Sequence, residues 1–254
     1  MTRPVRPQQL REQVARYIDD SAKIVVACLT AARSTNSVRE IYATSLSADT
    51  VLKSLDGRSL RPRLPAARSI VLRVTMLVSI GQVSLATVEL RRFVELMLWT
   101  VYFTDHPVEW RSFLSDPNAG FSQDVRKPIS HAARRELNYY FDYVRELANA
   151  EPSGLAKAAI NEIKRLTRDL NSAVHAGELA QTINRPPPHE GISDAVLQRF
   201  ARLQRRVFSN CCLLLAAYRR RQFDRFGASA RAHFDWLVGA KLRRELRRGP
   251  FGLA

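Results

Sequence analysis

A chain of 254 residues with 46% hydrophobic residues can bury a sizeable core as one domain, and its three cysteines, two of them adjacent at Cys211 and Cys212, argue against a disulfide framework. The N-terminal segment lacks the apolar core of a signal peptide, and Arg73 and Gln82 interrupt the most apolar stretch, 70–88, so we expect a cytoplasmic protein without a membrane span. The net charge of +16 predicts attraction to polyanions, either nucleic acid or an acidic partner protein.

Helical periodicity runs through the chain and period-two alternation is nearly absent, so we predict an all-α antiparallel bundle that forms a single domain over 1–254. The expected helices, in chain order, are 7–33, a shorter and broken helix over 38–55, a long central helix over 66–104 that could kink near Gly81, a short helix over 107–115, a helix capped by Ser130, a helix over 155–176, a long basic helix over 192–226 ended by Gly227, and a final helix over 229–248. Proline and glycine predict loops at 55–65 and 184–191.

The helix over 155–176 has two chemically distinct sides. Its apolar residues face the bundle, whereas Arg168, Ser172 and His175 fall together on the opposite side. Seven residues turn through about 700°, so Arg168 and His175 point nearly the same way, roughly 10 Å apart along the axis. Arginine can bind a phosphate, and histidine can move a proton at neutral pH. Together they could cleave RNA without a metal.

Other interpretations of this helix stay open. The same face could be an ordinary solvated or dimer-packing surface, or a non-catalytic ligand site. Lys164 and Arg165 could guide RNA to it or simply be exposed. Glu162 and Lys164 have the spacing that ends the core of a metal-dependent nuclease, but that core needs strands, and this segment is helical. No Cys/His cluster indicates zinc, so we expect neither a metal nor another cofactor.

The stretch "RDLNSAVHAGE" (168–178) resembles the signature helix of the HEPN family, with Arg168 in the arginine place, Asp169 in the polar place after it and His175 in the histidine place. The resemblance extends over about 66–223. It implies an all-helical, metal-independent endoribonuclease, typical of toxin–antitoxin and anti-phage defence loci. It also implies a homodimer in which two such helices face each other across a cleft, with Arg168 of one subunit near His175 of the other.

The stretch "LRRFVELMLWTVYFTDHPVEW" (90–110) resembles the preceding helix of HEPN-like proteins, in which an arginine and a glutamate lie a turn apart. Arg91 or Arg92 with Glu95 takes that place here. From the spacing alone, we interpret Arg91 and Glu95 as an i,i+4 structural pair, and His106 as the cap before Pro107.

The competing hypothesis is a helical nucleic-acid-binding, regulatory or adaptor subunit without catalysis. Between residues 199 and 248 there are 14 lysines and arginines against three acidic residues. Arg199, Arg202 and Arg206 on the helix over 192–226 would contact phosphates, and the face with Arg168 and His175 would be structural. In the catalytic hypothesis, Asp169 and Ser172 instead support the Arg168–His175 pair. A third hypothesis is that the protein is an adaptor that binds an acidic protein such as an antitoxin. Because arginine supplies 34 of the 40 basic residues, codon composition could also explain part of the charge.

Overall fold

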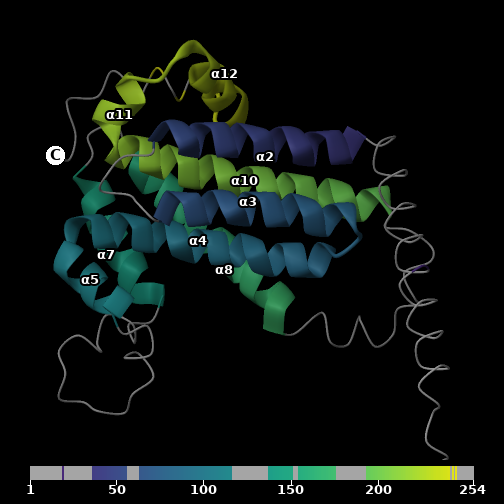
Figure 1. The fold of residues 1–254 in the computed structure, drawn as a ribbon, viewed down its shortest axis with the longest axis horizontal. Coiled ribbons are helices and arrows are strands. Elements are labelled where there is room, and N and C mark those ends of the chain that lie inside the picture. The colour runs from purple at the N-terminus through teal and green to yellow at the C-terminus, as the bar shows by residue number, and fades with distance from the viewer. Residues whose placement is uncertain are drawn as a thin grey trace, which may run out of the picture.

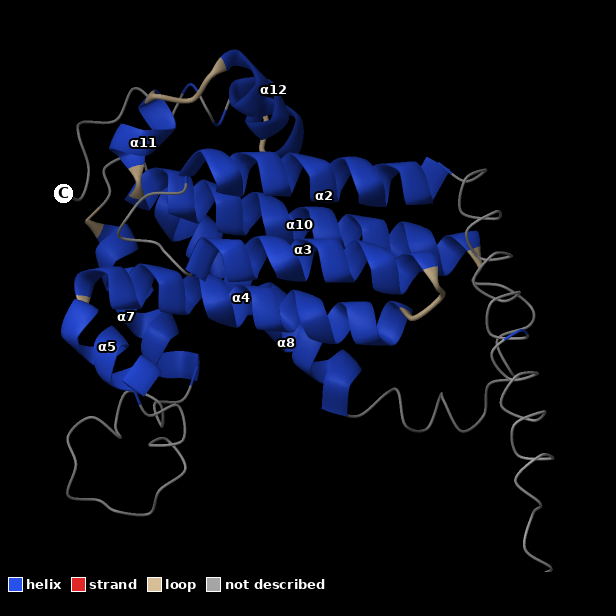
Figure 2. Cartoon of the chain, in the orientation of Figure 1, coloured by secondary structure: helices blue, strands red, loops and turns tan. Residues whose placement is uncertain are grey.

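The computed structural model describes Asp19 and residues 36–55, 63–115, 137–150, 154–175, 193–240, 242 and 244. All regular secondary structure in this part of the chain is helical, which confirms the predicted all-α class (Figure 2). The helices are α2 (Asn36–Leu55), α3 (Arg63–Ser79), α4 (Val83–Asp105), α5 (Pro107–Ser115), α7 (Leu137–Asn149), α8 (Leu155–His175), α10 (Asp194–Tyr218), α11 (Arg220–Asp224) and α12 (Ala228–Leu237).

The helices pack in two layers (Figure 1). Helices α2, α3 and α4 lie side by side, with α3 in the middle contacting both neighbours. Behind them α10 packs against α2, α4 and α8, and α7 packs against α4 and α8. Helix α12 covers part of α2. This arrangement leaves two broad faces, one made by α2, α3 and α4, the other by α8 and α10.

A tight turn separates α3 from α4, so the expectation of one long helix over 66–104 is wrong. Gly81 has φ of 83°, a left-handed conformation that glycine adopts without steric cost. The Gly81 N–H donates to Val78 O (3.0 Å) and the Gln82 N–H to Leu77 O (2.7 Å). This pair of bonds is the Schellman motif that ends a helix. The glycine therefore reverses the chain instead of bending it.

Other helix boundaries also differ from the expectation, and α3 begins at Arg63, inside the predicted loop 55–65. Helix α2 is continuous over Asn36–Leu55 and not broken. The basic helix predicted over 192–226 breaks at Arg219, which divides it into α10 and α11. Gly227 begins α12 as its N-cap residue, and α12 ends at Leu237. The predicted helix over 229–248 is therefore interrupted at Val238 and Gly239, and the described residues 240, 242 and 244 beyond the break are again helical. By contrast, α5 and α8 confirm the predicted helices. Of the expected helix 7–33 only Asp19 is described, and it is helical; the cap at Ser130 and the loop 184–191 lie outside the described residues.

Two predicted local contacts are present. Arg91 Nε lies 3.2 Å from Glu95 Oε1, which confirms the i,i+4 pair. His106 is the C-cap residue of α4, and its backbone N–H donates to Tyr102 O (3.1 Å). Both contacts stabilise α4 itself.

The core lies between the two layers and contains a group of buried polar side chains that are hydrogen-bonded to one another. Thr75 donates to Ser45 Oγ (2.6 Å), and the Gln204 amide donates to the same oxygen (2.8 Å), so α3, α2 and α10 meet at one point. Cys211 and Cys212 are buried and free. In the described part of the chain, no helix combines the length and apolar character needed to cross a bilayer.

Candidate nucleic-acid interface

Helix α8 buries its apolar side and leaves its cations in solvent. Ile163, Leu166 and Leu170 are buried in the core, as the sequence predicted. Arg168 and Asp169 are consequently exposed, because they lie on the opposite side of the same helix turns. The polar face of α8 is therefore available to a ligand at Arg168.

The predicted Arg168–His175 pair is only partly described. Helix α8 continues through Ser172 to His175, so both belong to the same helix as Arg168. The side chains of Ser172 and His175 lie outside the described residues. Their alignment with Arg168 stays a prediction from helical geometry.

The buried hydrogen bond from Gln204 to Ser45 fixes which side of α10 faces the bundle. Two residues turn through about 200°, so Arg202 and Arg206 point away from the α2–α3 seam that Gln204 contacts. Arg199 lies one turn before Arg202 and is also exposed. The first half of α10 thus presents arginines on the side opposite to α2 and α3.

Glu162 joins the two helices at this surface. Its carboxylate accepts two hydrogen bonds from Arg165, at 2.9 and 3.0 Å, and also accepts from the Arg206 guanidinium of α10. The hydrogen bonds from Arg165, opposed by partial burial and reinforced by Arg206, hold the pKa of Glu162 below its usual value. The carboxylate stays charged and fixes α8 against α10.

We call this surface the basic face. It consists of the side chains Lys157, Glu162, Lys164, Arg165, Arg168 and Asp169 of α8 and Arg199, Arg202 and Arg206 of α10. Seven cations stand against two carboxylates, a local excess of five positive charges. Arg165 and Arg206 share Glu162, and Lys164 Nζ lies 6.0 Å from the centre of the Phe141 ring. Among the described residues we see no ion pair to Arg168, Arg199 or Arg202, so these three are open to phosphate.

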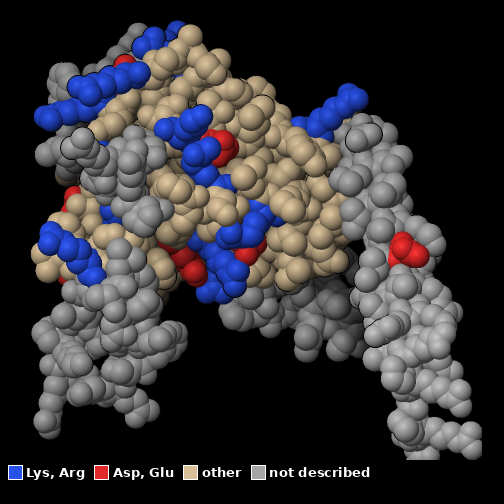
Figure 3. Space-filling view, in the orientation of Figure 1, with Lys and Arg blue, Asp and Glu red and all other residues tan. Residues whose placement is uncertain are grey.

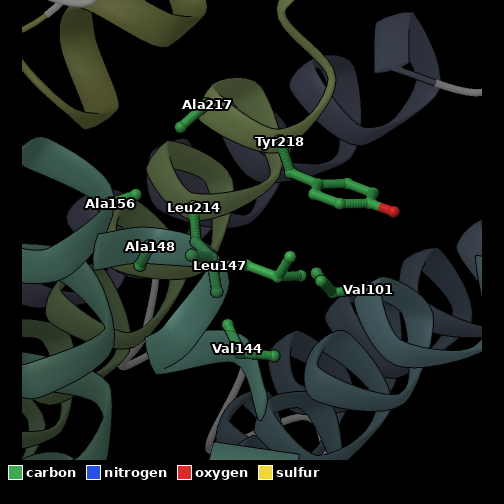
Figure 4. Close-up of a pocket in the computed structure, with 8 residues that line it drawn as sticks. All are labelled: Val101, Val144, Leu147, Ala148, Ala156, Leu214, Ala217 and Tyr218. Carbon is green, nitrogen blue, oxygen red and sulfur yellow. The ribbon is translucent and has the colours of Figure 1, made fainter. Parts of the chain in front are cut away.

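The pocket in Figure 4 does not belong to this face. It lies where α4, α7, α8 and α10 meet, and apart from Tyr218 its lining is aliphatic: Val101, Val144, Leu147, Ala148, Ala156, Leu214 and Ala217. None of the predicted site residues lines it. Such a pocket could accept an apolar group but holds no acid, base or nucleophile for hydrolysis.

A polar cluster that the sequence did not reveal lies at the end of α4. The Asp105 carboxylate accepts hydrogen bonds from Tyr143 (2.7 Å) and from Tyr218. Burial, together with the hydrogen bond to Asp105, raises the pKa of both phenols. A phenol with a raised pKa is a weaker acid, and less of it is present as the nucleophilic phenolate at neutral pH. We therefore interpret the cluster as a structural clamp between α4, α7 and α10.

The described residues offer no group of three His, Cys, Asp or Glu side chains that could hold a metal ion. Glu162 forms ion pairs with Arg165 and Arg206. Comparison with known proteins gives no match, either to a family model, to a curated protein or to a solved structure. The functional argument consequently depends on the chemistry of the basic face.

Proposed function

We propose that this protein binds RNA through the basic face. The observation that carries the proposal is the excess of five positive charges, contributed by two helices that Glu162 holds side by side. A phosphate backbone is a polyanion that exposed guanidinium groups match well, since arginine binds phosphate through two parallel hydrogen bonds. Contacts of this kind are independent of sequence and weaken with salt.

The binding test uses two arginine pairs of equal charge. Arg199→Ala/Arg202→Ala removes two exposed cations from the basic face, and Arg221→Ala/Arg225→Ala removes two exposed cations at α11. Each phosphate contact on a single strand contributes about 0.7 to the slope of log K against log salt. The first variant should therefore lower the slope by about 1.4 and weaken binding by roughly 25-fold at 0.1 M salt. The proposal fails if both variants weaken binding equally.

A second candidate function is metal-independent RNA cleavage on the same face, in the role of a toxin or anti-phage effector. It is favoured by the exposure of Arg168 on a helix that continues to His175. His175 would take the proton of a ribose 2′-hydroxyl or protonate the leaving oxygen, while Arg168 stabilises charge on the phosphate. An acidic antitoxin would be the natural protein partner of such an enzyme.

Cleavage is tested with purified protein and RNA in EDTA. The expected products end in 2′,3′-cyclic phosphates, and His175→Ala should abolish them while RNA binding persists. His175 contributes proton transfer, so the loss should be on the order of 10²- to 10⁴-fold. Cleavage that survives the substitution, or that requires Mg²⁺, excludes this mechanism. Binding without cleavage supports the first proposal alone.

A further inference from the structure

The face made by α2, α3 and α4 carries an apolar patch. Leu72 and Met76 of α3 are 60% and 67% exposed, and the neighbouring residues Tyr42 (46%), Leu46 (59%) and Leu85 (51%) extend the patch onto α2 and α4. We call these five residues the front apolar patch. Figure 3 looks onto this face, and much of its described surface is uncharged. Large apolar side chains that cluster on a solvent-exposed surface mark an interaction site.

Helix α3 carries apolar residues on both sides, and its outer side also exposes Ser69 and Arg73. Val71, Val74 and Val78 are buried in the core, whereas Leu72 and Met76, one turn apart, face solvent. A surface helix of a monomer normally turns polar residues outward, and a helix that is apolar all round is normally covered. The outer side of α3 therefore has the character of an interface that a second molecule covers.

The charges beside the patch favour a second copy of this chain as its occupant. Arg68 pairs with Asp49 (2.7 Å), and Glu89 pairs with both Arg73 (3.0 Å) and Arg92 (2.7 Å). A chain with a net charge of +16 repels itself least where the local excess of positive charge is small. With the exposed Arg39 and Lys53 of α2, this face has five cations against two carboxylates, an excess of three. The basic face, with a local excess of five positive charges, is a less favourable place for two copies to meet.

The size of the face also suits a dimer. The 17 residues of α3 span about 25 Å, and neighbouring helices pack 8–10 Å apart, so the three-helix face covers roughly 600–700 Å². A stable interface buries about 600–1,000 Å² of each partner, so the face lies at the small end of this range. A two-fold axis near the middle of α3 would set the Leu72 and Met76 pair of one chain against the same pair of the other.

We propose that the protein is a homodimer in which α3 packs on α3 of a second copy through the front apolar patch. Gln204 contacts the α2–α3 seam while Arg202 and Arg206 point the opposite way, so the two basic faces lie on the outside of this dimer. Each dimer would present two separate RNA-binding surfaces. This geometry differs from a dimer across α8, in which Arg168 and His175 of different subunits would share a cleft.

The test is sedimentation velocity of the full chain over a range of concentrations, in 0.15 and 0.5 M salt. The wild type should be a dimer at micromolar concentration at both salt concentrations, because salt does not screen apolar contacts. Met76→Glu should weaken dimerisation by more than about 100-fold, since it places two carboxylates in an apolar interface. Val108→Glu, at a 70% exposed position of α5, is the matched control and should remain dimeric.

Circular dichroism melting of the three proteins separates dissociation from unfolding, and Met76→Glu should keep the helical spectrum of the wild type. A wild type that is monomeric at 100 μM overturns the proposal, whatever else covers the patch. A dimer that survives Met76→Glu overturns it as well. If Arg199→Ala/Arg202→Ala changes the dimer while Met76→Glu does not, the interface lies on the basic face. If the wild-type protein dimerises but does not bind RNA, only the proposed function is contradicted.

Discussion

Replacing Glu162 by glutamine should strengthen RNA binding. The substitution keeps the size of the side chain but removes the carboxylate that engages Arg165 and Arg206. Two guanidinium groups then become free to contact phosphates. Two extra contacts steepen the slope of log K against log salt by about 1.4 for a single strand. If binding of the two proteins converges near 1 M salt, affinity at 0.1 M rises by up to about 25-fold.

Fluorescence anisotropy of a labelled RNA strand at five salt concentrations measures both the slope and the affinity. Asp49→Asn is the matched control, because it also removes one carboxylate and frees Arg68, but on the α2–α3–α4 face. That variant should bind like the wild type. Equal gains in both variants would mean that net charge alone governs binding. No gain in Glu162→Gln would mean that RNA does not contact the α8–α10 seam, and the reasoning would be refuted.

Three further predictions concern stability. Arg165 and Arg206 lower the pKa of Glu162 in the folded protein. The stabilising contribution of Glu162 is therefore present above its unfolded pKa of about 4.3 and is lost as the pH falls through the lower folded pKa. Between pH 5 and 3, urea unfolding should show a larger loss of stability for the wild type than for Glu162→Gln, and parallel curves would contradict this. Gly81→Ala should lower the stability of the fold by about 1–2 kcal/mol, because Gly81 has φ of 83°. Gly227→Ala should be neutral, because Gly227 has φ of −68° and open space where the Cβ would lie. Equal melting temperatures of the two variants would show that a side chain does not strain the α3–α4 turn. Leu166→Ala should cost about 2–5 kcal/mol by urea titration, since Leu166 is fully buried beneath α8, and a cost below 1 kcal/mol would contradict that placement.

The sequence predicted those features that depend on local pattern. Helix α8 has apolar residues at helical spacing on one side, so its extent and its buried side were predictable. Helices α3 and α4 are apolar over most of their circumference, and no change of pattern marks the turn between them. Gly81 was the available signal, but a glycine within an apolar run fits a kink as well as a C-cap. The division between α10 and α11 at Arg219 has no glycine or proline to indicate it.

Features that depend on long-range contact could not be predicted in the same way. The spacing of Glu162 and Arg165 suggests an ion pair within α8, but the second partner, Arg206, comes from another helix 44 residues away. The hydrogen bond between Ser47 and His233 (3.0 Å) joins residues 186 apart. The front apolar patch is also invisible in the sequence, because Leu72 and Met76 have the spacing of core residues. Only the packing of α3 between α2 and α4 shows that they are exposed.

Arginine footprinting of the RNA complex tests the central claim most directly. Phenylglyoxal modifies exposed arginines, and mass spectrometry reports each site with and without RNA. We expect RNA to protect Arg168, Arg199 and Arg202 on the basic face, while Arg221 and Arg225 at α11 react as in the free protein. Protection confined to α11, or equal at all five arginines, would contradict a binding surface formed by α8 and α10.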